Sequence, residues 1–202
     1  MVWSLRGSST FLEGSRSRRD ETLAWTLRHA PPGTGRFGLG GVELDRALFA
    51  STFATARASG LHSIPHAGEA TGPESIWAAL DLLGAERIGH GIAAGQDRAL
   101  LGRLASDQIP LEVCLTSNAL LNVVPSLAEH PLPVLLDAGV QVTLNTDDPG
   151  MFHTTLNREY VLAHEVYGLT RDDLGELARN AVRAAYCPPK LRDRLLAEID
   201  ST

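Results

Sequence analysis

Apolar residues recur along this chain in two alternating patterns, short runs of a few residues and longer stretches with helical spacing. The helical spacing is clearest in residues 44–59, where Leu48, Phe49, Phe53 and Ala56 repeat before a capping glycine. This spacing predicts helices over residues 19–29, 44–59, 75–83, 96–106 and 132–138, and over most of 154–199, with breaks near Gly168 and at Cys187-Pro188-Pro189. The short runs predict strands that start at Arg36, Gly60, Arg87, Ile109 and Val140. Repeated alternation of strand and helix indicates a parallel α/β fold.

The start of the chain differs from the rest. Residues 1–19 are rich in Ser, Arg and Gly without a clear period, and the next helical pattern stops at Pro31-Pro32-Gly33. We therefore expect residues 1–34 to form an atypical, partly disordered N-terminal segment, and residues 35–202 to form the α/β domain.

Polar side chains stand where several of the predicted strands end. His66 and Glu69 follow one strand, His90 ends the next, and Asp147 and Asp148 follow the last. Such loops carry the chemistry of parallel α/β folds, and a site spread over several strand ends favours a (β/α)-barrel over an open doubly wound sheet. An imidazole and a carboxylate together can bind a metal and move a proton. Taken alone, His66 is equally compatible with a hydrogen-bonded structural histidine, and Glu69 with a solvated loop acid.

Glycines flank two of these positions. The turn at Gly38-Leu39-Gly40-Gly41 fails the dinucleotide pattern at Glu43, so its glycines are expected to let the backbone approach a ligand or a neighbour closely. His90 lies between two glycines, which should leave room for a ligand beside it.

Composition excludes several classes of protein. Of the 202 residues, 44% are hydrophobic and 21% are charged, as in an ordinary globular protein. The net charge of -6 and the pI near 5.6 argue against nucleic acid or a membrane surface as a partner. The two cysteines, Cys114 and Cys187, have no C-x-x-C spacing, which fits a reducing, cytoplasmic location. No apolar run approaches the ~18 residues of a membrane span.

Taken together, the strand-end motifs resemble those of the adenosine deaminase family of metal-dependent hydrolases. The matching segments are His66-Ala67-Gly68-Glu69, Arg87-Ile88-Gly89-His90-Gly91, Glu112-Val113-Cys114 with Thr116-Ser117-Asn118, and Leu144-Asn145-Thr146-Asp147-Asp148-Pro149. They occur in the family's order, and the resemblance runs from about Phe37 to the C-terminus. It implies a TIM (β/α)8-barrel with C-terminal helices, in which the Phe37 strand matches the fourth strand, so that about strands 4 to 8 are present.

The resemblance also implies roles for individual residues. His66 and Asp147 match zinc ligands, and Glu69 matches the acid that protonates the purine at N1 while water attacks C6. His90 matches the histidine that orients the metal-bound water and stabilises charge. The implied substrate-binding groups are Asp148, toward N7, and the backbone N–H of Gly41, toward N3.

The implied reaction is zinc-dependent hydrolytic deamination of a 6-aminopurine nucleoside or base, which releases ammonia. Zn²⁺ lowers the pKa of bound water toward ~7, and the poor amine leaving group requires an acid. Leu115 and the glycine-rich turn resemble a bacterial adenosine deaminase-like branch. Adenosine, adenine and aminodeoxyfutalosine remain open as substrates.

One departure from the family is large. The chain contains no His-x-His pair, which completes the zinc site in family members, so two expected zinc ligands are missing. We interpret the sequence as a fragment or a gene that has lost its 5′ half, inactive alone and prone to self-association through unpaired barrel edges. Two alternatives are a cysteine hydrolase that uses Cys114 with His90, and a non-catalytic barrel remnant or partner subunit without bound metal.

Overall fold

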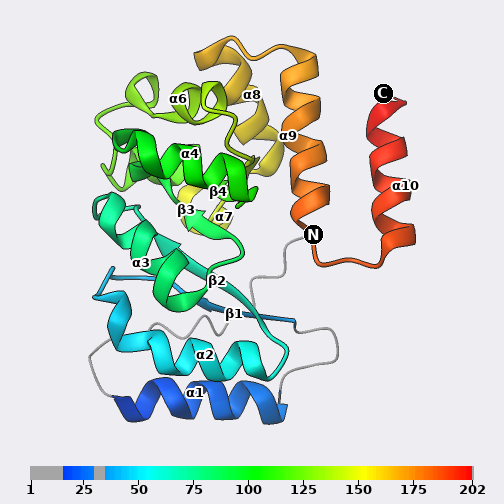
Figure 1. Cartoon of the computed structure of the whole chain (residues 1–202). Coiled ribbons are helices and arrows are strands. Elements are labelled where there is room, and N and C mark those ends of the chain that lie inside the picture. The colour runs from blue at the N-terminus through cyan, green and yellow to red at the C-terminus, as the bar shows by residue number, and fades with distance from the viewer. Residues whose placement is uncertain (1–15, 30–34, 202) are drawn as a thin grey trace.

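Five parallel strands form one sheet in the computed structural model, which describes residues 16–29 and 35–201 (Figure 1). They are β1 (Arg36–Leu39), β2 (His62–Ala67), β3 (Ile88–His90), β4 (Leu111–Val113) and β5 (Val142–Leu144). Each strand pairs with the next in the chain, giving the order β1-β2-β3-β4-β5. A doubly wound sheet reverses its order at a switch point, whereas a barrel keeps consecutive strands adjacent. The sheet is therefore an arc of a barrel, and the predicted fold class is confirmed.

Helices connect the strands and continue beyond the last one. They are α1 (Arg16–His29), α2 (Ala50–Ala58), α3 (Pro73–Leu83), α4 (Arg98–Asp107), α5 (Leu115–Leu120), α6 (Leu132–Asp137), α7 (Pro149–Phe152), α8 (Leu156–Tyr167), α9 (Arg171–Ala184) and α10 (Pro189–Asp200). Short 3-10 turns are η1 (Arg46–Phe49), η2 (Ile92–Gln96) and η3 (Leu127–Glu129). None of the helices in these residues is long and apolar enough to cross a membrane.

The start of the chain corrects one expectation. Helix α1 begins at Arg16, so the irregular structure predicted up to residue 19 is wrong for its last residues. Residues 1–15 and 30–34 lie outside the described part, and the prediction of disorder there stays a prediction. Leu23 of α1 is buried and Asp20 accepts a hydrogen bond from Thr52 of α2 at 2.9 Å, so α1 belongs to the packed body.

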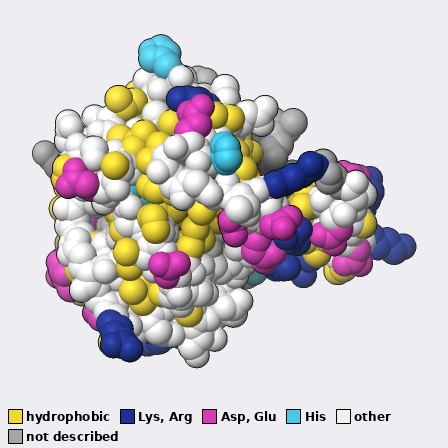
Figure 2. Space-filling model, turned by 90° about the horizontal axis from the view of Figure 1, so that it is seen from above, with side chains coloured by type: hydrophobic (Ala, Val, Ile, Leu, Met, Phe, Trp, Pro, Cys, Tyr) yellow, Lys and Arg dark blue, Asp and Glu magenta, His cyan; other side chains and the backbone are white. Residues whose placement is uncertain are grey.

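The breaks between the last helices fall where the sequence placed them. Helix α8 ends at Gly168, whose φ of +68° is left-handed and favours glycine. Helix α9 packs on β5 and α10 packs on α9, at the right of Figure 1. Figure 2 shows charged side chains gathered on this extension, where Arg179 pairs with Glu176 and Asp200.

The link between α9 and α10 is anchored at the amino ends of the strands. The ring of Tyr186 stacks on His62 of β2, with centroids 3.7 Å apart and planes 7° apart. His62 Nδ1 lies 2.6 Å from a carboxylate oxygen of Glu86, and Arg87 donates to the carbonyl of Ala184 at 2.7 Å. Contacts at this end of a barrel serve stability, whereas the active sites of such barrels lie at the opposite end.

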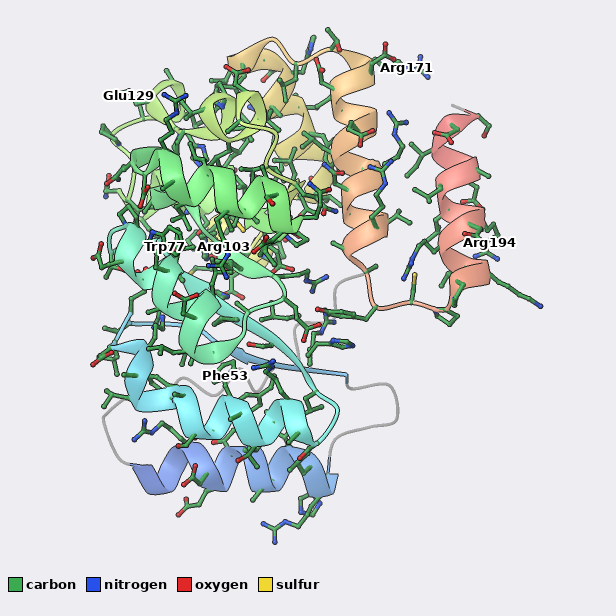
Figure 3. All side chains as sticks on the ribbon, in the orientation of Figure 1. Phe53, Trp77, Arg103, Glu129, Arg171 and Arg194 are labelled. Atoms are coloured by element: carbon green, nitrogen blue, oxygen red, sulfur yellow. The ribbon has the colours of Figure 1, made fainter. Side chains whose placement is uncertain are left out.

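Two apolar clusters form the core. The larger lies between β2–β5 and the helices that cover them, and includes the fully buried Ile76, Leu100 and Leu135. The smaller lies between β1 and the α1–α2 pair, where Phe53 meets Phe37 edge to face with centroids 5.2 Å apart. Figure 3 shows Phe53 on the side of α2 that faces β1.

Phe53→Ala should lower the free energy of unfolding by about 3–5 kcal/mol, because it leaves a cavity in the smaller cluster. Leu48→Ala on η1 is the control, since Leu48 is 46% exposed and its loss should cost far less. Urea denaturation followed by circular dichroism compares the two variants. Equal stability losses would mean that the α1–α2 layer does not depend on this cluster.

Candidate active site

The predicted site residues converge at the carboxyl ends of the strands. His66 is the next-to-last residue of β2, Glu69 lies in the following loop, and His90 is the last residue of β3. The register pairs His66 with Gly89 and Ala67 with His90, which places the two histidines on neighbouring strands at the same level.

Three of these side chains meet. Ligand atoms of His66, Glu69 and His90 all lie within 4.8 Å of one another. The His66 and His90 rings are 4.8 Å apart and inclined by 71°, and His90 Nε2 lies 3.5 Å from Glu69 Oε2. An imidazole pair beside a carboxyl group can bind a metal and transfer a proton.

Left-handed backbone turns direct these side chains. His90 has φ +62° and Asp147 has φ +54°, values that residues other than glycine rarely adopt. Gly68, between His66 and Glu69, has φ +66°. Strained backbone of this kind clusters at functional sites, where the surrounding structure holds it.

The glycines around His90 serve a different purpose from the one expected. A Cβ at Gly89 would lie 2.4 Å from His66 Cδ2, and one at Gly91 would lie 2.6 Å from a methyl carbon of Leu111. The predicted room for a ligand on these two sides is therefore wrong, because neighbouring side chains fill it. Gly40 also contacts the His66 ring, since its Cβ would lie 3.4 Å from Cε1. The close backbone approach expected of the glycine-rich turn is thus to a neighbouring histidine.

Glu69 has the environment of a proton donor. Its side chain is 12% exposed. Burial, followed by repulsion from Asp147 and Glu43, raises the pKa of Glu69 to about 7. A carboxyl group with this pKa is partly protonated at neutral pH, as a general acid needs to be.

A buried ion pair that the sequence analysis missed holds the Glu69 loop. Glu43 accepts hydrogen bonds from the backbone N–H groups of Glu69 at 3.3 Å and Thr71 at 2.9 Å, and from the Thr71 hydroxyl. Arg46 pairs with Glu43 at 3.2 Å and donates to the carbonyl of His66 at 2.8 Å. One sequence signal could have revealed this ion pair. An acidic and a basic residue, Glu43 and Arg46, lie three positions apart directly after the glycine-rich turn.

Asp147 is held from the other side. The hydroxyl of Ser117 on α5 donates to Asp147 Oδ2 at 2.7 Å. Helix α5 is itself anchored by the buried Glu159 of α8, which accepts from the N–H of Thr116 at 3.1 Å and from the Thr154 hydroxyl at 2.6 Å. The polar strand end predicted at residues 116–118 is therefore a short helix that supports the site.

The two predicted substrate-binding positions lie on the same edge but are exposed. Gly41 follows β1 with φ +89°, and Asp148 precedes α7. Among the described residues, no hydrogen bond or ion pair joins the Asp148 side chain to the other site residues. Their predicted roles stay predictions.

Cys114 does not have the environment of a nucleophile. It is buried, and burial raises the pKa of its thiol well above the usual value. A thiolate is the reactive form, so this environment argues against the cysteine hydrolase.

The side chains at this site are of the types that ligate zinc. Imidazole nitrogen and carboxylate oxygen are zinc donors, and a catalytic zinc takes three protein ligands and keeps one open position. The glycines at positions 40 and 89 fix His66, and Ser117 fixes Asp147. His66 and Asp147 thus have the orienting contacts expected around metal ligands.

The comparisons identify the family. The adenosine deaminase family model matches residues 9–202. An aminodeoxyfutalosine deaminase of Streptomyces coelicolor is 49% identical over 181 residues, which are 89% of this chain and 47% of that protein. The chain belongs to the adenosine deaminase family, and it spans about half the length of this curated relative.

Solved structures agree with the partial barrel. The adenine deaminase of Arthrobacter aurescens is 33% identical and superposes with a TM-score of 0.89, covering 94% of this chain and 58% of that one. An amidohydrolase from Burkholderia ambifaria, solved with bound zinc, is 25% identical with a TM-score of 0.85, covering 93% of this chain and 54% of that one.

Carboxyl ¹³C NMR should show Glu69 titrating near pH 7. Asp147→Asn should lower the pKa of Glu69, because it removes a nearby like charge, whereas Asp137→Asn at the exposed last residue of α6 should not. The raised pKa of Glu69 also determines how the free energy of unfolding changes with pH. Glu69 is protonated in both states at low pH, and the unfolded chain ionises first, so the wild type loses stability relative to Glu69→Gln as pH rises from about 4.5 to 7. An ordinary pKa for Glu69 would remove it as a neutral-pH acid.

Proposed function

We propose that this chain forms about half of a zinc-dependent deaminase that hydrolyses a 6-aminopurine nucleoside or base to the 6-oxo product and ammonia. The observation that carries the proposal is the placement of Glu69, with its pKa raised to about 7, within 4.8 Å of His66 and His90 ligand atoms. Relatives named as aminodeoxyfutalosine deaminase and adenine deaminase support a purine substrate.

His66 and Asp147 would hold the zinc, together with ligands from outside the residues identified here. Zinc supplies the chemistry of lowering the pKa of water toward ~7. Glu69 donates its proton to ring nitrogen N1, which makes C6 more electrophilic. The resulting carboxylate then takes the proton of the hydroxyl that has added to C6 and passes it to the amine, which leaves as ammonia when the C6–N bond breaks. His90 stabilises negative charge on the oxygen that adds to C6. The N–H of Gly41 and the carboxylate of Asp148 orient the purine.

A second candidate is a deaminase-like partner subunit without bound metal. The observation in its favour is that only His66 and Asp147 are identifiable as zinc ligands, whereas catalytic zinc normally has three protein ligands. Metal content separates the candidates, because a non-catalytic subunit needs no zinc. A cytoplasmic location, inferred from composition, stays a prediction.

The isolated chain should hold little zinc, show no measurable purine deamination and self-associate. Loss of one orienting partner alone costs about 10–100-fold in metal affinity, so absent ligands cost more. Among the described residues, the outer edges of β1 and β5 carry no paired strand, and such edges favour association. Elemental analysis, ammonia release and sedimentation against the 21.7 kDa monomer test these points.

Co-expression with the remaining part of the Streptomyces coelicolor relative should restore zinc and activity. A zinc-loaded, active monomer of this chain alone would contradict the proposal.

The complemented protein is this chain co-expressed with the remaining part of the relative. In it, Glu69→Gln should lower kcat by roughly 10²–10⁴ while zinc content stays at the wild-type level, because only the proton donor is lost. Asp147→Ala should instead lower zinc content. Glu74→Gln, on the exposed start of α3, is the matched control and should change neither quantity. Unchanged turnover in Glu69→Gln with full zinc would remove Glu69 from the mechanism.

A further inference from the structure

A line of buried hydrogen bonds extends from His90 away from the site. Asn118 Nδ2 lies 3.2 Å from His90 Nδ1, and Asn118 Oδ1 lies 3.1 Å from His130 Nε2. The line ends where the backbone N–H of Leu132 donates to His130 Nδ1 at 3.0 Å. The exposed fractions of His90, Asn118 and His130 are 2%, 0% and 3%, so water does not compete for these bonds.

The fixed end of this line determines the direction of every bond in it. A backbone N–H only donates, so His130 Nδ1 must be an acceptor, and the proton of the neutral ring is on Nε2. Burial lowers the pKa of His130 to about 4, which agrees with a neutral ring.

The direction of the His130 bond also fixes the orientation of the Asn118 amide and the direction of its bond to His90. His130 Nε2–H donates to the Asn118 oxygen, so the amide NH₂ faces His90 and donates to Nδ1. The reversed amide would place two donors, NH₂ and Nε2–H, against each other in a buried site. With its Nδ1 accepting, His90 carries its own proton on Nε2, the nitrogen nearest Glu69.

We propose that Asn118 and His130 are positioning residues that lock His90 in the Nε2–H tautomer. His90 therefore presents a hydrogen-bond donor, and no lone pair, toward Glu69 and the reacting atoms. Only the catalytic meaning of this lock rests on the proposed function. The donor stabilises charge developing on the oxygen that adds to the purine, but it has no site to accept that oxygen's proton. Proton transfer is left to Glu69.

The tautomer can be read in the isolated chain. Long-range ¹⁵N–¹H spectra of histidine-labelled protein distinguish protonated from unprotonated ring nitrogens, and His90→Gln identifies the His90 signals among the seven histidines. The wild type should show Nε2 protonated and Nδ1 unprotonated. Asn118→Asp should invert this, because a carboxylate only accepts and draws the proton to Nδ1. Asn122→Asp, the same change at an exposed position, should leave His90 unchanged.

Two results would contradict the proposal that Asn118 and His130 fix the His90 tautomer. One is a wild-type His90 protonated on Nδ1, and the other is a folded Asn118→Asp chain that keeps the Nε2–H form. If Asn118→Asp does not fold, the wild-type spectrum still decides, and His130→Gln adds a second test. Its amide N–H takes the place of His130 Nε2–H, so the wild-type tautomer should persist.

Kinetics of the complemented protein test the catalytic meaning. Asn118→Asp should lower kcat by about 10²–10³, the effect of losing one donor to a developing oxyanion, with KM nearly unchanged. His130→Gln should restore most of kcat relative to His130→Leu. An inverted tautomer with full kcat would refute the catalytic role but not the lock. Absence of deamination in the complemented wild type would refute the proposed function and leave the spectroscopic result standing.

Discussion

The site depends on the buried ion pair between Glu43 and Arg46, whose side chains are each only 2% exposed. Burying two charges costs free energy unless every polar group is compensated. Here part of the compensation comes from the loop proposed to carry the chemistry, since Glu43 accepts the N–H groups of Glu69 and Thr71, and Arg46 donates to the carbonyl of His66. The end of β1 and the end of β2 are therefore tied together. Movement of Glu69 would cost Glu43 a hydrogen-bond donor, and movement of His66 would cost Arg46 an acceptor.

A second buried carboxylate does the same on the other side of the site. Glu159 is fully buried and accepts from Thr116 and Thr154, which fixes the start of α5 and with it the hydroxyl of Ser117 beside Asp147. Glu69 differs from Glu43 and Glu159 in the hydrogen-bond donors around its carboxyl group. Burial and the nearby carboxylates of Asp147 and Glu43 raise the pKa of Glu69, and His90 Nε2 lies 3.5 Å from its carboxylate. The same residue type is thus a hydrogen-bonded anchor at positions 43 and 159 and a carboxyl group with a raised pKa at position 69.

Sequence reasoning found what local patterns encode. Helical spacing, the capping Gly168 and short apolar runs predicted the helices and strands, and parallel topology then placed His66, Glu69 and His90 on one edge. It missed the supports because their partners are distant in the chain. Arg46 reaches the carbonyl of His66 twenty residues away, and Thr116 reaches Glu159 forty-three residues away. No period or spacing in a single sequence signals such contacts.

Metal binding and proton chemistry are separately supported in this chain. Within the described residues, the segments from β1 through α8 supply the hydrogen-bond partners of the Glu69 loop and of the line behind His90. The proposed zinc ligands His66 and Asp147 would supply only part of a coordination shell. Protein groups alone make the hydrogen bonds that hold the Glu69 loop and the His90 ring. Zinc content and the histidine tautomer therefore report on two separate parts of the proposed site.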